Sequence, residues 1–225
     1  MTQSESDSRR PLKTRAASWA RVVSSFLARR RVSPNAISTM GIAFAVIGAL
    51  SIGYGRFAGS LSVEVWAFVL GAVFIQLRLL ANMLDGMVAV EGGRGGALGN
   101  LYNEFPDRIE DVVLIVSVGY AATASGWPMP EIIGWTACVL ALLVAYVRAL
   151  AAGIGGGHPF HGPMAKPHRM FLLTCGCLVA AATAQAGMAG HVLYVTLLVM
   201  ILGMVITLIR RLGAVRLELR RSWEQ

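Results

Sequence analysis

Residues 82–107 read NMLDGMVAVEGGRGGALGNLYNEFPD and join two long apolar runs. Acidic residues crowd this stretch and the start of the run that follows it, at Asp85, Glu91, Glu104, Asp107, Glu110 and Asp111. A carboxylate beside hydrocarbon is costly unless it has a partner, a cation or a water-filled cavity, so it marks a functional site by default. The stretch therefore predicts a polar site at the point where two apolar helices meet.

The spacing of four polar residues indicates what this site holds. Asn82 and Asp85 are three residues apart and Asn103 and Asp107 are four apart, so each pair shares one face of a helix. Two antiparallel helix ends would then present four oxygen-bearing side chains to one point. Hard cations such as Mg²⁺ prefer these oxygens, and no Cys/His cluster offers softer ligands. The pattern predicts a divalent-cation site; the alternative is a set of solvated helix caps.

The composition places the whole chain in a membrane. Of its 225 residues, 56% are hydrophobic and 14% are charged, whereas soluble domains carry about 25% charged residues. This excludes a soluble enzyme, a disordered chain and a coiled coil. A spanning helix needs about 20 apolar residues, and six runs qualify, at residues 36–54, 61–81, 109–126, 131–152, 169–188 and 191–209.

The predicted fold is an all-α integral membrane protein with six transmembrane helices and a polar cavity that faces the cytoplasm. Residues 33–211 form the membrane domain, 1–32 a basic N-terminal arm with a short interfacial helix at 17–28, and 212–225 a basic C-terminal tail. Because a proline suits the first turn of a helix, Pro106 favours a start of the third span near Asn103.

Positive charge sets the orientation. The net charge is +8, and Lys and Arg gather in the two termini and around the second and fourth loops, while the other loops offer only Arg56. Since basic flanks stay in the cytoplasm, the termini and these loops are expected there. No nucleic-acid-binding pattern accompanies the charge, so anionic lipid headgroups are the expected partner. The three cysteines lie in apolar runs and indicate packing.

The central stretch also resembles the signature of the CDP-alcohol phosphotransferase family, DxxDGxxARx8GxxxDxxxD. Five residues match at the required spacing, namely Asp85, Gly86, Ala89, Gly99 and Asp107. Three positions depart from it, with Asn82 and Asn103 in place of aspartates and Val90 in place of arginine. SPNAIS at 33–38, YVRA at 146–149 and GPMAKPHR at 162–169 extend the resemblance over nearly all of the spans.

The resemblance implies a membrane enzyme, commonly homodimeric, that transfers a phosphate-linked group from a CDP-linked donor to an alcohol and releases CMP. By position, Asp85, Asp107, Asn82 and Asn103 would hold Mg²⁺ or Mn²⁺, and Asp107 would also be the general base. Gly86, Ala89 and Gly99 would let the nucleotide approach. The family has four aspartates where this chain has two, so we expect one tightly held cation, or a second recruited with the donor's diphosphate.

Basic residues supply a second half of the predicted site. Arg148, Lys166 and Arg169 flank the fourth and fifth spans and are candidates for binding substrate phosphate; the alternative is the positive charge that flanks any span. Arg78 is expected to reach the membrane surface by simple snorkelling. The histidines at 158, 161 and 168 lack the spacing of a zinc site.

Together these features predict a phosphatidyltransferase of the bacterial cytoplasmic membrane that uses CDP-diacylglycerol and a polar alcohol, with a phosphorylated alcohol favoured by the basic residues. The alternative is a family member that binds a CDP-lipid or a partner without turnover, which the two asparagines and Val90 favour. A transporter would instead place charges near the bilayer midplane and repeat its halves, and neither feature is present in the sequence.

Overall fold

The computed structural model describes residues 18–91, 97–155, 157 and 161–223, and the side chains of these except 90, 91, 97–103, 222 and 223. This part of the chain is helical. The elements in chain order are α2 (Ser18–Arg29), α3 (Pro34–Gly55), α4 (Leu61–Glu91), α5 (Ala97–Ala121), η2 (Ala122–Ser125), α6 (Pro130–Gly153), α7 (Lys166–Thr183), η3 (Ala184–Ala186) and α8 (Ala189–Trp223).

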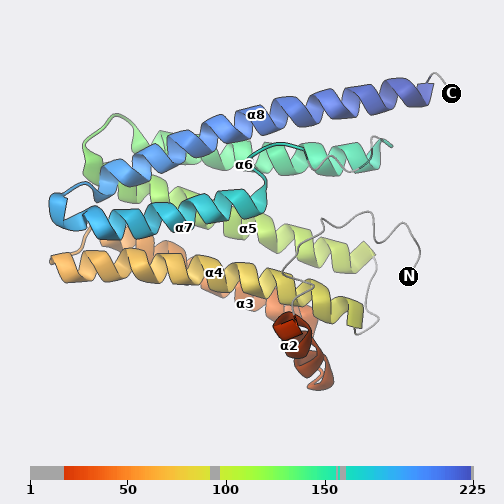
Figure 1. Ribbon diagram of the computed structural model, residues 1–225, viewed down its shortest axis with the longest axis horizontal. Coiled ribbons are helices and arrows are strands. Elements are labelled where there is room, and N and C mark those ends of the chain that lie inside the picture. The colour runs from red at the N-terminus through yellow and green to blue at the C-terminus, as the bar shows by residue number, and fades with distance from the viewer. Residues whose placement is uncertain (1–17, 92–96, 156, 158–160, 224–225) are drawn as a thin grey trace.

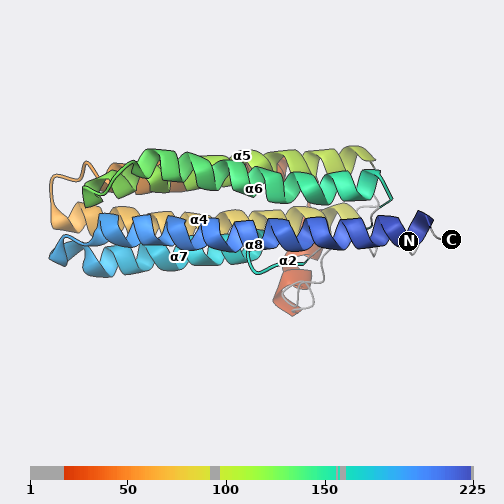
Figure 2. The same cartoon turned by 90° about the horizontal axis from the view of Figure 1, so that it is seen from above.

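The long helices α3 to α8 run side by side as a bundle (Figure 1). They form two layers, with α3, α5 and α6 in one and α4, α7 and α8 in the other, as Figure 2 shows. The start of α3 and the end of α8 lie at the same end of the bundle. The end of α4 and the start of α5 lie at this end too, so the acidic residues on these helices share one side with both termini of the bundle.

Local sequence signals set the helix boundaries. The hydroxyl of Ser33 accepts a hydrogen bond from the backbone N–H of Ala36 at 3.1 Å, and Pro34 occupies the first turn, where its missing N–H costs nothing. Gly126 and Gly187 follow the two short 3₁₀ turns with φ of 70° and 68°. This left-handed conformation suits glycine and ends the preceding helix.

Five of the helices are long and apolar enough to cross a membrane, and they comprise α3, α4, α6, α7 and α8. The helix α5 does not meet this criterion, because the acidic residues of the site lie in its first half. It nevertheless runs along the bundle between α3 and α6. An integral membrane protein is therefore supported, and the sixth span stays a prediction.

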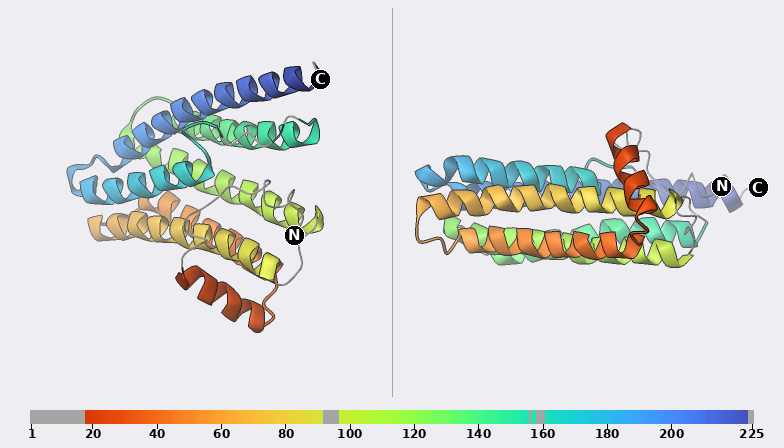
Figure 3. Two further views of the ribbon diagram at one scale, coloured as in Figure 1. Left: turned by 45° about the vertical axis from the view of Figure 1, so that its right-hand side comes forward. Right: turned by 90° about the horizontal axis from the view of Figure 1, so that it is seen from below.

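Two predicted details of the helices are tested directly. The helix α2 at Ser18–Arg29 occurs where a short N-terminal helix was expected, and it lies across the end of the bundle against α4 (Figure 3). The predicted start of the third span near Asn103 is wrong. The helix α5 begins at Ala97 and carries Pro106 in its interior.

Small residues allow the helices to pack closely. A Cβ added to Gly119 on α5 would lie 2.8 Å from the Cα of Gly134 on α6. The alanines Ala180, Ala181 and Ala184 are buried in the core of the same chain. They therefore serve packing within the chain.

This close approach leads to the first prediction, that Gly119→Ala destabilises the α5–α6 interface. The added methyl meets backbone atoms, which cannot rotate away, so the helices must separate at a cost of about 1–3 kcal/mol. Gly53→Ala is the matched control, because nothing lies within 4 Å of its added Cβ. Thermal unfolding in detergent measures both variants. Equal melting temperatures for the two would show that this contact does not limit the packing of α5 on α6.

Candidate active site

Asp85 lies near the C-terminal end of α4, with only 3% of its surface exposed. Its Oδ2 atom accepts a hydrogen bond of 2.6 Å from the hydroxyl of Ser38 on α3. Its Oδ1 atom is buried and accepts no hydrogen bond from a described side chain. The neighbouring Gly86 is also buried, and Ala89 lies one turn further along α4. Asp85 is thus held by the Ser38 hydroxyl through one oxygen, and the other oxygen has no hydrogen-bond partner among the described side chains.

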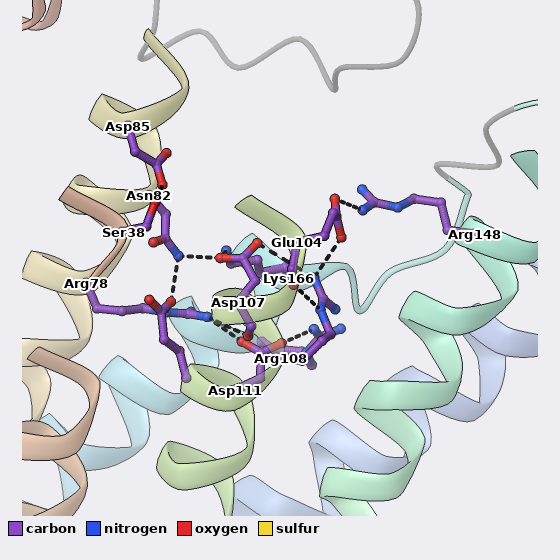
Figure 4. Close-up of polar contacts among 12 residues, drawn as sticks. Ser38, Arg78, Asn82, Asp85, Glu104, Asp107, Arg108, Asp111, Arg148 and Lys166 are labelled. Atoms are coloured by element: carbon purple, nitrogen blue, oxygen red, sulfur yellow. Dashed lines mark hydrogen bonds and ion pairs between the residues drawn. The ribbon is translucent and has the colours of Figure 1, made fainter. Parts of the chain in front are cut away.

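Asp107 projects from the first half of α5 toward α4 and α7 (Figure 4). Its Oδ1 atom accepts a hydrogen bond of 2.5 Å from the side-chain amide of Asn82 and forms an ion pair with the ammonium group of Lys166, the first residue of α7. Arg108 lies 3.6 Å from Oδ2. Three separate segments therefore position this carboxylate, which is 8% exposed.

Asn82 lies on α4 one turn before Asp85, and its side chain reaches Asp107 on α5. Its amide nitrogen faces two carboxylates, because it donates to Asp107 and also to Oε2 of Glu110 at 2.7 Å. An aspartate at this position would have no proton to donate to either. Asn82 is therefore a hydrogen-bond donor within the site, in addition to its predicted place near a cation.

A buried ion-pair network lies beneath these groups. Arg78 on α4 pairs with Glu110 and, at 2.7 Å, with Asp111, and Arg169 on α7 pairs with the other oxygen of Asp111 at 2.6 Å. These four residues are each at most 1% exposed. The expectation that Arg78 snorkels to the surface is wrong, because it is fully buried and forms ion pairs with two carboxylates. The network ties α4, α5 and α7 together below the site.

Sequence reasoning missed this role for Arg78, Glu110 and Asp111, although a signal was present. Arg78 is the only basic residue within the second apolar run, and an ionisable residue in such a run requires a partner. The acids on the facing end of α5 are the nearest candidates. The long separation in sequence between Arg78 and Glu110 hid the pairing.

The outer rim of the site carries a second set of ion pairs. Glu104 contacts Arg148 on α6 and, at 3.3 Å, Arg108 on the next turn of α5. These side chains are partly exposed, between 21% and 50%. The three predicted phosphate-binding residues therefore occupy different places. Arg148 lies at the rim, Lys166 forms an ion pair with Asp107, and Arg169 belongs to the buried network. All three are brought to one side of α5, and each is paired with an acid.

Other predicted residues lie apart or outside the described side chains. Asn103 and Gly99 are on α5 in the part whose side chains are not described. His158 lies outside the described residues, whereas His161 and His168 are exposed. Among the described residues, no group of three Asp, Glu, His or Cys side chains forms a preformed metal site.

The donor set nevertheless fits a divalent cation that takes part of its ligands from a substrate. The free Asp85 Oδ1 and the unpartnered Oε1 of Glu110 are buried carboxylate oxygens, which are the ligands hard cations prefer. Mg²⁺ commonly takes one or two protein carboxylates together with substrate phosphates. Asp85 and Asp107 match that arrangement.

Comparisons with known proteins show which chains this one resembles. No protein-family model matches the chain. A phosphatidylinositol phosphate synthase of Mycolicibacterium smegmatis is 28% identical over 211 residues, which cover 91% of this chain and 88% of the relative. A protein of the same name from Mycobacterium tuberculosis is 29% identical over 77% of this chain and 76% of its own length. The chain is thus similar over most of its length to phosphatidylinositol phosphate synthases, and this similarity supports the predicted resemblance to the CDP-alcohol phosphotransferase family.

The fold of the chain is similar to solved structures as well. A crystal structure of the Mycobacterium tuberculosis phosphatidylinositol phosphate synthase with CDP-DAG bound superposes with a TM-score of 0.71 at 23% identity, covering 88% of this chain and 94% of that one. A structure of that protein in complex with manganese and citrate gives a TM-score of 0.70 at 22% identity, with 87% and 88% covered. The helical arrangement is thus shared over nearly the whole chain.

Proposed function

We propose that this phosphatidyltransferase transfers a phosphatidyl group from CDP-diacylglycerol to a polar alcohol. The acceptor oxygen attacks the lipid-bearing phosphorus, the bond from that phosphorus to the CMP oxygen breaks, and CMP leaves. Asp107 takes the proton of the attacking hydroxyl. The observation that carries the proposal is the pair of buried motif aspartates, Asp85 and Asp107, in a membrane bundle, where Asp107 also forms an ion pair with Lys166.

The chain's own residues divide the work between binding and proton transfer. Asp107 is held by Asn82 and Lys166, so its orientation is fixed before the acceptor arrives. A base must lie within hydrogen-bond reach of the proton that it takes. Gly86, Ala89 and Gly99 are proposed to leave room for the nucleotide on α4 and α5. The Lys166 ammonium is proposed to move from Asp107 to substrate phosphate, which frees the carboxylate.

A Mg²⁺ or Mn²⁺ ion is proposed to be held by Asp85 and Asp107, with the amide oxygens of Asn82 and Asn103 as neutral ligands. When bound, the ion neutralises charge on the diphosphate and on the leaving CMP. The manganese complex of the structurally similar synthase supports a metal requirement. Because two carboxylates replace the four of the family motif, one tightly held ion is proposed, with a second recruited by the donor.

The acceptor is proposed to be a phosphorylated polyol such as inositol phosphate. The names of the curated relatives support this class, and so do the basic side chains of Lys166 and Arg108 beside Asp107. Arg148 at the partly exposed rim, with Lys166 and Arg169 behind it, is proposed to favour a doubly charged acceptor phosphate. Glycerol phosphate is the competing acceptor of similar charge.

The donor's chemistry fits the predicted orientation. With the site at the end of the bundle that bears the basic termini, acyl chains remain in the bilayer while the diphosphate reaches the aspartates. We therefore propose a bacterial cytoplasmic membrane location with the termini and site in the cytoplasm, and a homodimeric assembly as in the family. Residues 1–32 and 212–225 are proposed as basic arms at the surface of the 33–211 membrane domain.

The second candidate is a family member that binds CDP-lipid without turnover. Its support is the loss of the first motif aspartate at Asn82, together with the ion pair that engages Asp107. Purified protein in detergent would be incubated with labelled CDP-diacylglycerol, Mn²⁺ and a panel of free and phosphorylated alcohols. CMP release with one acceptor supports the transferase, whereas donor binding without CMP release under every combination supports the binding protein.

The metal requirement gives a second prediction. Removing divalent cations with EDTA is expected to reduce CMP release to background, because the diphosphate then has no counter-charge at Asp85. Adding Mg²⁺ or Mn²⁺ in excess should restore the rate, which separates metal loss from unfolding. CMP release that persists after exhaustive chelation would contradict the proposed role of the ion.

A further inference from the structure

Glu110 occupies a position that the family signature does not assign to any function. It lies three residues after Asp107 and so on the same face of α5. Its side chain is 0% exposed. One oxygen, Oε2, accepts hydrogen bonds from Arg78 and from the amide of Asn82. Glu110 is thus bonded directly to the residue that replaces the first motif aspartate.

The second oxygen of Glu110 also lies near Asn82. Oε1 is buried and has no hydrogen-bond partner among the described residues. A Cβ added to Gly41 on α3 would lie 2.6 Å from this oxygen and 3.0 Å from Oδ1 of Asn82. The glycine therefore leaves space at which Glu110 and Asn82 meet. A buried carboxylate oxygen without a donor is costly unless a ligand completes it.

The charges at positions 82 and 110 explain why an asparagine lies beside Glu110. An aspartate at 82 would place a third carboxylate against Asp107 and Glu110, which Asn82 now joins by two hydrogen bonds. With asparagine there, the group Asp85, Asp107 and Glu110 carries three carboxylates. An aspartate at 82 and a neutral residue at 110 would carry the same number. The two arrangements differ only in whether the third carboxylate lies on α4 or on α5.

We infer that Glu110 supplies the negative charge that the first motif position lacks, and that Asn82 couples it to Asp107. Glu110 acts as a positioning residue, because it holds Asp107 through the amide of Asn82 and adds to the field that attracts a divalent cation. This inference rests on the proposed cation site. It assigns the asparagine a role that the loss of an aspartate alone does not suggest.

The test measures Mn²⁺ binding to the full chain in detergent, without CDP-lipid, from the electron paramagnetic resonance signal of free Mn²⁺. Glu110→Gln is expected to weaken binding by about tenfold to a hundredfold, because one charge near the ion is lost. Asn82→Asp combined with Glu110→Gln is expected to return affinity to within about threefold of the parent. Glu131→Gln, which removes a carboxylate in the first turn of α6, is the matched control.

The outcomes separate the inference from the proposed function. A parent chain that binds no Mn²⁺ overturns the cation site itself. A parent that binds Mn²⁺ while Glu110→Gln binds equally well overturns only the role of Glu110. Failure of Asn82→Asp to restore binding in the double variant also overturns it, because a purely structural partner of Arg78 would not be replaced from position 82.

A further pair of variants decides the matter if Glu110→Gln alone does not fold. Asn82→Asp adds a carboxylate to the parent set, so it is expected to bind Mn²⁺ more tightly and to melt at a lower temperature in EDTA than the parent. Adding Glu110→Gln to Asn82→Asp should reverse both changes. Equal Mn²⁺ affinity for the single and double variants would overturn the inference.

Discussion

Asp107→Asn is expected to lower the rate of CMP release by about 10²–10⁴-fold, the range typical for loss of a general acid or base. The amide keeps the size of the side chain and one oxygen, but it cannot take the proton of the acceptor. Asp85 and the basic residues remain in place, so Mn²⁺-dependent binding of the donor should largely survive. Release of labelled CMP and retention of labelled CDP-diacylglycerol measure the two effects.

The contacts of Asp107 make this substitution informative. Its carboxylate accepts a hydrogen bond from the Asn82 amide and forms an ion pair with Lys166. The variant replaces this carboxylate by a neutral amide, so the negative charge that holds the lysine is lost. Glu64→Gln, near the start of α4 at the other end of the bundle, is the control for a lost carboxylate and should retain the parent rate. Near-normal turnover by Asp107→Asn would exclude Asp107 as the base, and loss of donor binding would assign it to binding instead.

The sequence predicts most of the bundle because its signals are local. Five of the apolar runs correspond to helices that meet the length and composition of a membrane span, and the Ser33–Pro34 start follows from capping chemistry. The position of the motif is also local, since a short connection between antiparallel helices brings the segments with Asp85 and Asp107 to the same end of the bundle. These features need only the periodicity and end preferences of helices.

The rest depends on contacts between residues far apart in sequence. The third span was expected to begin near Asn103. The helix α5 instead starts at Ala97 and continues through Pro106. Cations from α4 and α7 meet the acids of α5, and this pairing makes a charged helix tolerable within the bundle. Which acid meets which cation depends on helix rotation and packing, so Arg78 was assigned to the surface and Glu110 was left without a role.

This network also defines how the site is held in place. Asp111 forms ion pairs with Arg78 of α4 and Arg169 of α7, so a single carboxylate links both helices to α5. Arg169 donates in addition to the backbone carbonyl of Met164, just before Lys166. The position of the Lys166 ammonium on Asp107 therefore depends on the buried pairs below it. Binding residues and structural residues form one connected set.

Arg78→Met is expected to destabilise the protein by about 3–5 kcal/mol, the cost of removing one partner from a buried ion pair. Methionine fills most of the space but leaves Glu110 with only the Asn82 amide and Asp111 with only Arg169. Thermal unfolding in detergent measures the loss. Arg108→Met is the matched control, because that arginine is 21% exposed and its pair with Glu104 is screened by solvent.

Adding Glu110→Met to Arg78→Met tests whether the loss comes from an unpaired charge or from altered packing. Replacing both partners of a buried pair by apolar side chains removes the unpaired carboxylate, so the double variant should melt above Arg78→Met alone. If the double variant instead melts at or below the single variant, the arginine stabilises the bundle through shape rather than charge. If Arg78→Met is no less stable than Arg108→Met, the buried pairs do not hold α4 to α5, and the position of Asp107 must depend on the surrounding helix packing instead.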